Sequence, residues 1–161
     1  MAVREATAAD AEAVAEFLEG HGSAVVARHG ELLDATGRPA LLVEDEGRLV
    51  GLLTYVVDDT GCEVLTLHAD PPRTGVGTEL MEAAAEIAAA RGCDRLWLVT
   101  TNDNVDALRF YQRRGFRLTG LHPGAVDHSR RELKPQIPEL AENGIAIRDE
   151  LDLERPLGQP W

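Results

Sequence analysis

Two glycines, Gly75 and Gly77, lie in the segment PRTGVGTEL, which spans residues 72–80. Glycine lets backbone N–H groups approach a ligand closely and adopt positive φ. A helix is predicted to begin directly after this loop, so the free N–H groups and partial positive charge of its first turn would join them. We therefore predict a cradle for a phosphate or pyrophosphate, with Arg73 as a charge partner and Thr78 as the helix cap.

Other phosphate-binding patterns do not fit this loop. The pattern GxxxxGK[ST] is absent, and a dinucleotide-binding GxGxxG would require a glycine where Leu80 stands. The alternative interpretation is a glycine-rich turn that only begins a helix, because a single GxG pattern has little specificity.

A second group of residues lies on the next predicted helix. Asn104, Ala107 and Tyr111 are spaced i, i+3 and i+7, which places them on one helix face. A phenol, with a pKa of about 10, can return a proton to a departing thiolate, whose pKa is about 8.5. Tyr111 suits this role of general acid if its hydroxyl faces a cleft. The alternative is a packed aromatic face, which is our interpretation of Phe110 and Phe116.

These residues must be positioned by alternating strands and helices. Strands are predicted at residues 3–5, 40–44, 48–57, 62–69, 95–100, 116–121 and 145–153. Helices are predicted at residues 8–20, 78–91, 105–114 and 125–133. Residues 21–38 fit either a helical turn or an extended chain. The order indicates an α/β fold, with helices layered on a mixed sheet.

Charge and length restrict the classes of function. The chain has 16 Lys and Arg against 28 Asp and Glu, a net charge of −12. This argues against a nucleic-acid groove or an anionic membrane surface as partner. The length of 161 residues fits one domain, predicted at residues 1–155 with a tail at 156–161.

Cysteine and histidine spacing indicates the setting. Cys62 and Cys93 form no CxxC motif, so we expect a reducing, cytoplasmic location without disulfides. No HxH or HExxH spacing occurs, so no metal is predicted. No signal peptide is evident, and the longest apolar stretch, residues 49–57, is too short to span a bilayer.

Taken together, the two motifs resemble those of the GNAT superfamily of acyl-coenzyme A-dependent N-acyltransferases. The first motif is Gly75-Val76-Gly77 before a helix, and the second is Asn104-x-x-Ala107-x-x-x-Tyr111-x-x-x-Gly115-Phe116. The order of elements between residues 3 and 121 agrees as well. The resemblance implies a mixed, mostly antiparallel central sheet, flanked by helices, whose strands near 62–69 and 95–100 splay apart.

The resemblance implies an acetyl-CoA site between the splayed strands. The pantetheine arm would pair with the backbone of Leu67, His68 and Ala69. The pyrophosphate would bind loop amides at Arg73, Thr74, Gly75, Val76, Gly77 and Thr78. Asn104, with Ala107 beside it, would contact the cofactor arm, and Tyr111 would be the general acid. One departure is Pro72, which stands where the family usually has Gln or Arg.

The resemblance also suggests a base. Glu63 resembles the glutamate that histone-type members use to deprotonate the amine, directly or through water, and His68 is a competing base. The alternatives are a solvated strand glutamate and a histidine satisfied by hydrogen bonds. Strict alternation would place Glu63, Leu65 and Leu67 on one face of the strand, and Val64, Thr66 and His68 on the other.

The acceptor side is less well defined. His21 and His29 follow the first helix, in the segment that lines the acceptor side in this family. The proline-containing excursion at 122–144 is expected to form a lid or an acceptor wall. Three cations lie in this excursion: Arg130, Arg131 and Lys134, which is the only lysine of the chain. They could recognise an acidic acceptor or a cofactor phosphate, or they could form a solvated helix face.

The predicted function is an N-acetyltransferase that moves acetyl from acetyl-CoA to a primary amine by direct attack. The acceptor would be a small molecule or a peptide, and the net charge of −12 favours a cationic amine. The alternative is a non-catalytic acyl-CoA-binding or sensing module on the same fold. A homodimer is also considered, because symmetric dimers are the commonest assembly.

Overall fold

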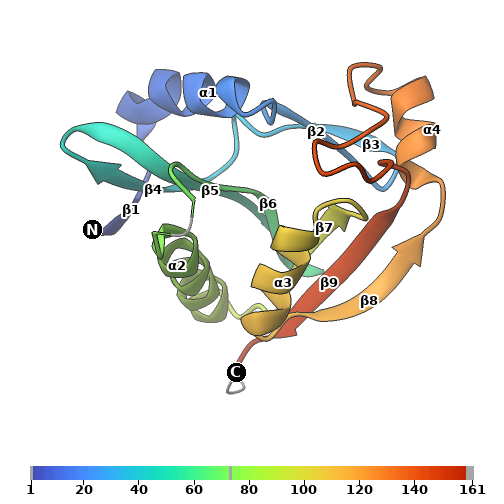
Figure 1. Ribbon diagram of the computed structural model, residues 1–161. Helices are drawn as coiled ribbons and strands as arrows, with labels where there is room; N and C mark the ends of the chain where they lie inside the picture. Colours follow the sequence, from blue (N-terminus) through green and yellow to red (C-terminus); the bar gives the residue numbers. More distant parts are fainter. Residues whose placement is uncertain (1, 73, 159–161) are drawn as a thin grey trace.

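A seven-stranded sheet forms the centre of the molecule (Figure 1). The computed structural model describes residues 2–72 and 74–158. In spatial order the strands are β1 (Val3–Glu5), β4 (Ala40–Asp45), β5 (Arg48–Asp58), β6 (Gly61–Ala69), β7 (Arg95–Thr101), β9 (Glu150–Pro156) and β8 (Arg117–His122). Neighbouring strands are antiparallel, except that β6 and β7 run parallel. The expected fold class, a mixed and mostly antiparallel sheet flanked by helices, is confirmed.

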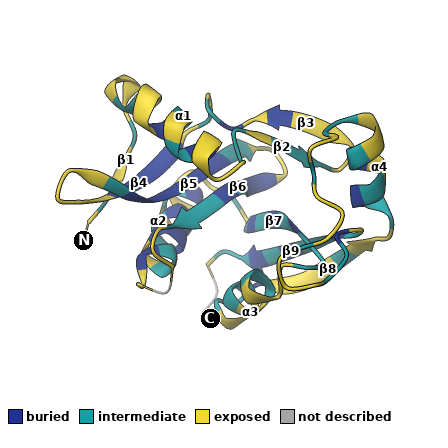
Figure 2. Cartoon of the chain, turned by 45° about the horizontal axis from the view of Figure 1, so that its top comes forward, coloured by how far each residue is buried: buried dark blue, intermediate teal, exposed yellow. Residues whose placement is uncertain are grey.

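Helices cover both faces of this sheet. They are α1 (Ala11–Gly20), which follows a 3-10 turn at Ala8–Asp10, α2 (Val76–Ala90), α3 (Val105–Arg113) and α4 (Ala125–Glu132). Buried residues are concentrated along the central strands (Figure 2). On β4, Leu41 packs in the core cluster under α2, whereas Leu42 packs in the cluster under α1. The period-2 alternation of a strand therefore supplies both hydrophobic layers.

The sheet splays between β6 and β7, as the sequence predicts. The two strands pair only at Cys62 with Leu96 and at Glu63 with Trp97, and then diverge. A bulge in β6 accompanies the splay: Thr54 pairs with Thr66 but Tyr55 pairs with Val64, which leaves one extra residue in β6. An extra residue of this kind bends its strand and interrupts the ladder.

The bulge also corrects the predicted faces of β6. Val64 packs in the cluster under α2, Leu65 packs against the cluster under α1, and Leu67 returns to the α2 side. The prediction that Leu65 and Leu67 share a face is therefore wrong, because the extra residue reverses the alternation. As a result, Glu63 and His68 do not lie on opposite faces. Glu63 points away from the α2 cluster that holds its neighbours Cys62 and Val64, and His68 shares the α1 side with its partner Leu52.

Two further segments differ from the sequence prediction. Residues 21–38, which were ambiguous, form a two-stranded hairpin of β2 (Val25–Arg28) and β3 (Glu31–Asp34). The final strand begins at Glu150 rather than at residue 145. The reason is that the Asn102 side chain binds the backbone before it, accepting from the N–H groups of Arg148 and Asp149.

The end of the described chain stays close to the sheet. Pro156 is the last residue of β9, and the Leu157 N–H donates to the Asp94 carbonyl at 2.8 Å. The division between a domain at 1–155 and a tail at 156–161 stays a prediction, and residues 159–161 lie outside the described part. Within that part, no helix has the length and apolar character needed to cross a membrane.

Candidate active site

A cavity of about 930 Å³ lies between the splayed end of β6 and α3. Residues from β6, the glycine loop and the start of α2 line one side: Leu67, Ala69, Pro72, Gly75, Gly77 and Thr78. Residues from α3 and its C-terminal end line the other: Asp106, Ala107, Arg109, Phe110, Tyr111, Arg113 and Arg114. The structure thus brings the two sequence motifs to opposite walls of one cavity.

The loop wall depends on close approach of backbone. Gly75 has φ +85 and caps α2, a left-handed conformation that glycine adopts without strain. The helix begins at Val76 rather than at residue 78, so its first N–H groups lie in the loop itself. A Cβ at Gly77 would lie 3.3 Å from Cζ of Phe110, and a Cβ at Gly51 would collide with the Val76 side chain. Because Gly51 and Gly77 have no Cβ, α2 can pack closely against both β5 and α3.

Thr78 does not cap the helix, contrary to the prediction. It stands in the first turn of α2, and its Oγ1 accepts from Nε and Nη2 of Arg114, at 2.9 and 2.6 Å. Arg114 also stacks over the Phe110 ring, 3.7 Å from its centroid. The predicted cap failed because the helix starts two residues earlier. The Thr78 hydroxyl instead joins the two walls of the cavity.

The lining is positively charged although the chain is acidic. Among the described residues, three arginines, Arg109, Arg113 and Arg114, line the cavity, against one acidic side chain, Asp106. The N-terminus of the 15-residue helix α2 adds partial positive charge. This arrangement suits a polyanionic ligand. The two motifs do not include these arginines, although Arg114 follows Tyr111 by three residues and so falls on the same helix face.

Tyr111 lies in the α3 wall. Its ring contacts Phe110 and Phe116 at centroid distances of 5.6 and 5.7 Å. Burial raises the pKa of Tyr111 to about 12. The phenol is therefore protonated throughout the neutral range and has a proton to donate. Phe116 is core, as predicted, whereas Phe110 is only partly buried and lines the cavity.

Only some of the other residues predicted to contact the cofactor line the cavity. Ala107, Leu67 and Ala69 line the cavity, but Asn104 does not; it precedes α3, and its Nδ2 donates to Oγ1 of Thr100 at 3.5 Å. In the loop, the Val76 side chain is buried in the core, and Thr74 Oγ1 donates to the Pro71 carbonyl at 3.4 Å. Arg73 lies outside the described residues.

His68 points away from the cavity. Its Nε2 lies 2.9 Å from Oγ of Ser23, and its ring stacks on His21 with centroids 4.3 Å apart. Burial, with a smaller effect of His21, lowers the pKa of His68 to about 4. These contacts favour the alternative interpretation, in which the His68 ring is satisfied by a hydrogen bond and does not serve as a base. Only the His68 backbone remains a candidate for pairing with a cofactor arm.

Glu63, the predicted base, is engaged in an ion pair. Its side chain is buried at the point where β6 and β7 separate, and both carboxylate oxygens accept from Arg28, each at 2.7 Å. Arg28 belongs to β2, so the pair fastens the hairpin to the sheet. The hydrogen bonds that Arg28 donates to Glu63 raise the pKa of Arg28, which favours the charged guanidinium.

The excursion after β8 also supports the hairpin. Lys134 donates from Nζ to the carbonyls of Gly22 and Val25, at 3.2 and 2.7 Å. Arg130 donates to the carbonyls of Ile137, Pro138 and Ile147. Neither cation belongs to the cavity lining. Both hold backbone, so the interpretation as ligand-recognising cations does not apply to Arg130 or Lys134.

Comparisons with known proteins agree with the fold. Residues 7–116 match the family described as the acetyltransferase (GNAT) family. YdhI, an uncharacterized protein of Bacillus subtilis, is 46% identical over 109 residues, 68% of either chain. Rv2669, an uncharacterized N-acetyltransferase of Mycobacterium tuberculosis, is 33% identical over 112 residues, 68% of this chain and 70% of that one. A GNAT family acetyltransferase from Elizabethkingia anophelis, crystallised with acetyl-CoA bound, has a TM-score of 0.67 at 20% identity over 97% of both chains.

Proposed function

Because this chain belongs to the acetyltransferase (GNAT) family, we propose that it transfers acetyl from acetyl-CoA to a primary amine of a small molecule or peptide. The observation that carries the proposal is the placement of Tyr111 in one wall of a cavity whose opposite wall is the glycine loop. One wall can hold the phosphates while the other supplies a proton.

Acetyl-CoA binds along the cavity. Its diphosphate accepts from the N–H groups in the first turn of α2 and lies near Arg109, Arg113 and Arg114. Its pantetheine arm extends along the β6 backbone at Leu67–Ala69, where β7 no longer pairs with that strand. The thioester is then placed near the splay, within reach of the α3 wall.

The reaction is a direct displacement. The neutral amine attacks the thioester carbon, so that a C–N bond forms and the C–S bond breaks. The coenzyme A thiolate takes a proton from the Tyr111 hydroxyl. The attacking nitrogen, which is positively charged once the C–N bond has formed, loses its extra proton to water and becomes the amide nitrogen. Tyr111 regains a proton from solvent before the next turnover. We assign the proton acceptor to water because the two candidate bases are engaged elsewhere, Glu63 with Arg28 and His68 with Ser23.

The acceptor approaches from the face of the sheet that carries the hairpin. On that face β9 presents Glu150, Asp152 and Glu154, whose alternation with buried Leu153 places them on the side away from α2. These carboxylates are already engaged, Glu154 with Arg95 and Asp152 with two histidines, so it is the net charge of −12 that supports a cationic amine as acceptor. The cytoplasmic location and the homodimer accompany the proposal as predictions; both cysteines are free thiols, and gel filtration tests the dimer.

A thiol-release assay tests the proposal. Acetyl-CoA is incubated with the protein and a panel of amino acids, polyamines, aminoglycosides and peptides, while thermal melting with acetyl-CoA reports binding. We expect stabilisation by acetyl-CoA and turnover with at least one cationic amine. Stabilisation without turnover on any amine would favour the non-catalytic binding module instead. The absence of both would contradict the proposal.

A further inference from the structure

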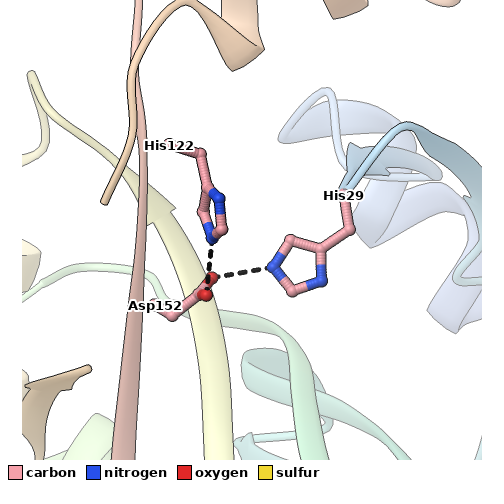
Figure 3. Close-up of side chains that lie close together, drawn as sticks. All are labelled: His29, His122 and Asp152. Atoms are coloured by element: carbon pink, nitrogen blue, oxygen red, sulfur yellow. Dashed lines mark hydrogen bonds and ion pairs between the residues drawn. The ribbon is translucent and has the colours of Figure 1, made fainter. Parts of the chain in front are cut away.

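Three side chains from distant parts of the sequence converge on the hairpin face of the sheet (Figure 3). His29 lies in the turn between β2 and β3, His122 ends β8, and Asp152 lies in β9. Nε2 of His29 lies 2.7 Å from Asp152 Oδ1, and Nε2 of His122 lies 2.7 Å from Asp152 Oδ2. The two imidazoles thus point their outer nitrogens at one carboxylate. None of the three belongs to the cavity lining.

We propose that His29, His122 and Asp152 form a binding site for a divalent transition-metal ion such as Zn²⁺. The three ligand atoms lie within 4.8 Å of one another. Donor atoms around one tetrahedral Zn²⁺ lie about 3.3 Å apart, given metal–nitrogen bonds of about 2.0 Å. An ion therefore enters after small rotations of exposed or half-exposed side chains. Two imidazoles and one carboxylate select zinc, nickel or cobalt over magnesium or calcium, which prefer all-oxygen sites.

Binding of an ion would replace the two hydrogen bonds between the histidines and Asp152. Without an ion, each Nε2–H donates to Asp152. With an ion bound, each neutral imidazole gives its Nε2 lone pair to the metal and carries its proton on Nδ1 instead. A neutral ring therefore releases no proton when the ion binds, whereas a protonated ring releases one. The carboxylate then gives one oxygen to the ion, which leaves the fourth position of a tetrahedral site for water.

The surroundings hold the ligands in place. The His29 backbone has φ 49 in a two-residue turn, and its N–H donates to Oε1 of the buried Glu150 at 3.0 Å. The His29 ring stacks on Trp97, with centroids 5.8 Å apart and an interplanar angle of 10°. These two contacts restrain the position of the His29 backbone and the orientation of its ring before an ion binds.

Asp152 is positioned by a glycine. It pairs with Gly120 of β8, where a Cβ would lie 2.7 Å from Oδ2 of Asp152. Any side chain at residue 120 would displace the carboxylate that both histidines face. The bound ion would fasten the hairpin turn to β8 and β9, at the face where the acceptor is proposed to bind.

Equilibrium dialysis of the chelator-treated full chain against ZnCl₂ tests the site. We expect one Zn²⁺ per chain and a higher melting temperature with Zn²⁺ than with Mg²⁺, since an ion that binds only the folded state stabilises it. The variants His29→Gln, His122→Gln and Asp152→Asn should each weaken Zn²⁺ binding by about 10-fold or more. His128→Gln, an exposed histidine on α4, is the matched control.

A second measurement keeps the test valid if a variant fails to fold. Co²⁺ added to the unaltered chain should give visible d–d absorption that one equivalent of Zn²⁺ abolishes. Binding well below one ion per chain, or binding that persists in the His29→Gln/His122→Gln double variant, would overturn the proposal. Acetyl transfer is not the readout, so this outcome is independent of the proposed enzyme function.

Discussion

Arg28 and Glu63 form a bidentate ion pair at the point where β6 and β7 of the central sheet separate. Nε and Nη2 of Arg28 donate to the two oxygens of Glu63, each at 2.7 Å, and the side chains are 12% and 4% exposed. Two parallel charge-assisted bonds fix orientation as well as distance. The residue that resembles a family base is thus, in this chain, the anchor of the β2–β3 hairpin.

The first prediction concerns this pair. Arg28→Met and Glu63→Gln should each lower the free energy of unfolding by about 3 kcal/mol, because each leaves a buried charged partner behind. In urea unfolding, the double variant should lose less than the sum of the two. The surface pair Arg4–Asp10 is the control, and its coupling should be much smaller because solvent screens it.

The same variants test how Glu63 serves catalysis. A positioning role predicts that Arg28→Met and Glu63→Gln reduce kcat by similar factors and leave the pH profile in place. If Glu63→Gln alone abolished turnover and removed an acidic limb from the profile, Glu63 would be the base, and the assignment of water would be wrong.

The second prediction concerns the packing of α2 on β5. Gly51→Ala puts a methyl group into the Val76 side chain and 3.1 Å from Leu80 Cδ1, so the start of α2 must shift. We expect a loss of about 1–3 kcal/mol in unfolding free energy and weaker acetyl-CoA binding by calorimetry. Val76→Ala in the same chain should restore part of both, and Gly37→Ala, which meets open space, should change neither.

The third prediction concerns Tyr111. Tyr111→Phe should lower kcat by about 100-fold while acetyl-CoA affinity stays the same, because only the donated proton is lost. The buried tyrosine Tyr55 supplies the control: Tyr55→Phe should leave kcat unchanged. Since the pKa of Tyr111 is about 12, its ionisation should not reduce the rate below about pH 11. Equal rates for Tyr111→Phe and the unaltered protein would exclude it as the acid.

The fourth prediction concerns the pH dependence of stability. The pKa of His68 falls from its ordinary value of 6.5 to about 4 on folding, so the unfolded chain binds the proton first as pH drops. The stability that neutral His68 contributes is therefore complete above pH 6.5 and is lost between pH 6.5 and pH 4, by up to about 3 kcal/mol.

Urea unfolding at several pH values measures this effect. The difference in unfolding free energy between the unaltered protein and His68→Gln should shrink as pH falls through this range, whereas the exposed His128→Gln should track the unaltered protein. A difference independent of pH would show that His68 does not titrate as described.

Local patterns in the sequence determined the two walls of the cavity. The glycines at 75 and 77, and the spacing of Ala107 and Tyr111, depend only on neighbouring residues and helix periodicity. The sequence also predicted the splay, through the resemblance that these motifs carry. The predicted boundaries of the helices and strands were less accurate. The start of α2 depends on the left-handed conformation of its cap, Gly75, and the start of β9 depends on the hydrogen bonds of the Asn102 side chain.

Only the tertiary structure decided what the chemical groups outside those motifs do. The bulge that turns Leu67 toward α2 depends on the register between β5 and β6, which no single strand encodes. Arg28 meets Glu63 across 35 residues, and His29 meets Asp152 across 123. A side chain's partner at that range is set by strand order and packing, so spacing along the chain gave no sign of the proposed metal site. The sequence by itself determined the family and the cavity, and the folded sheet decided which of the polar residues lie together.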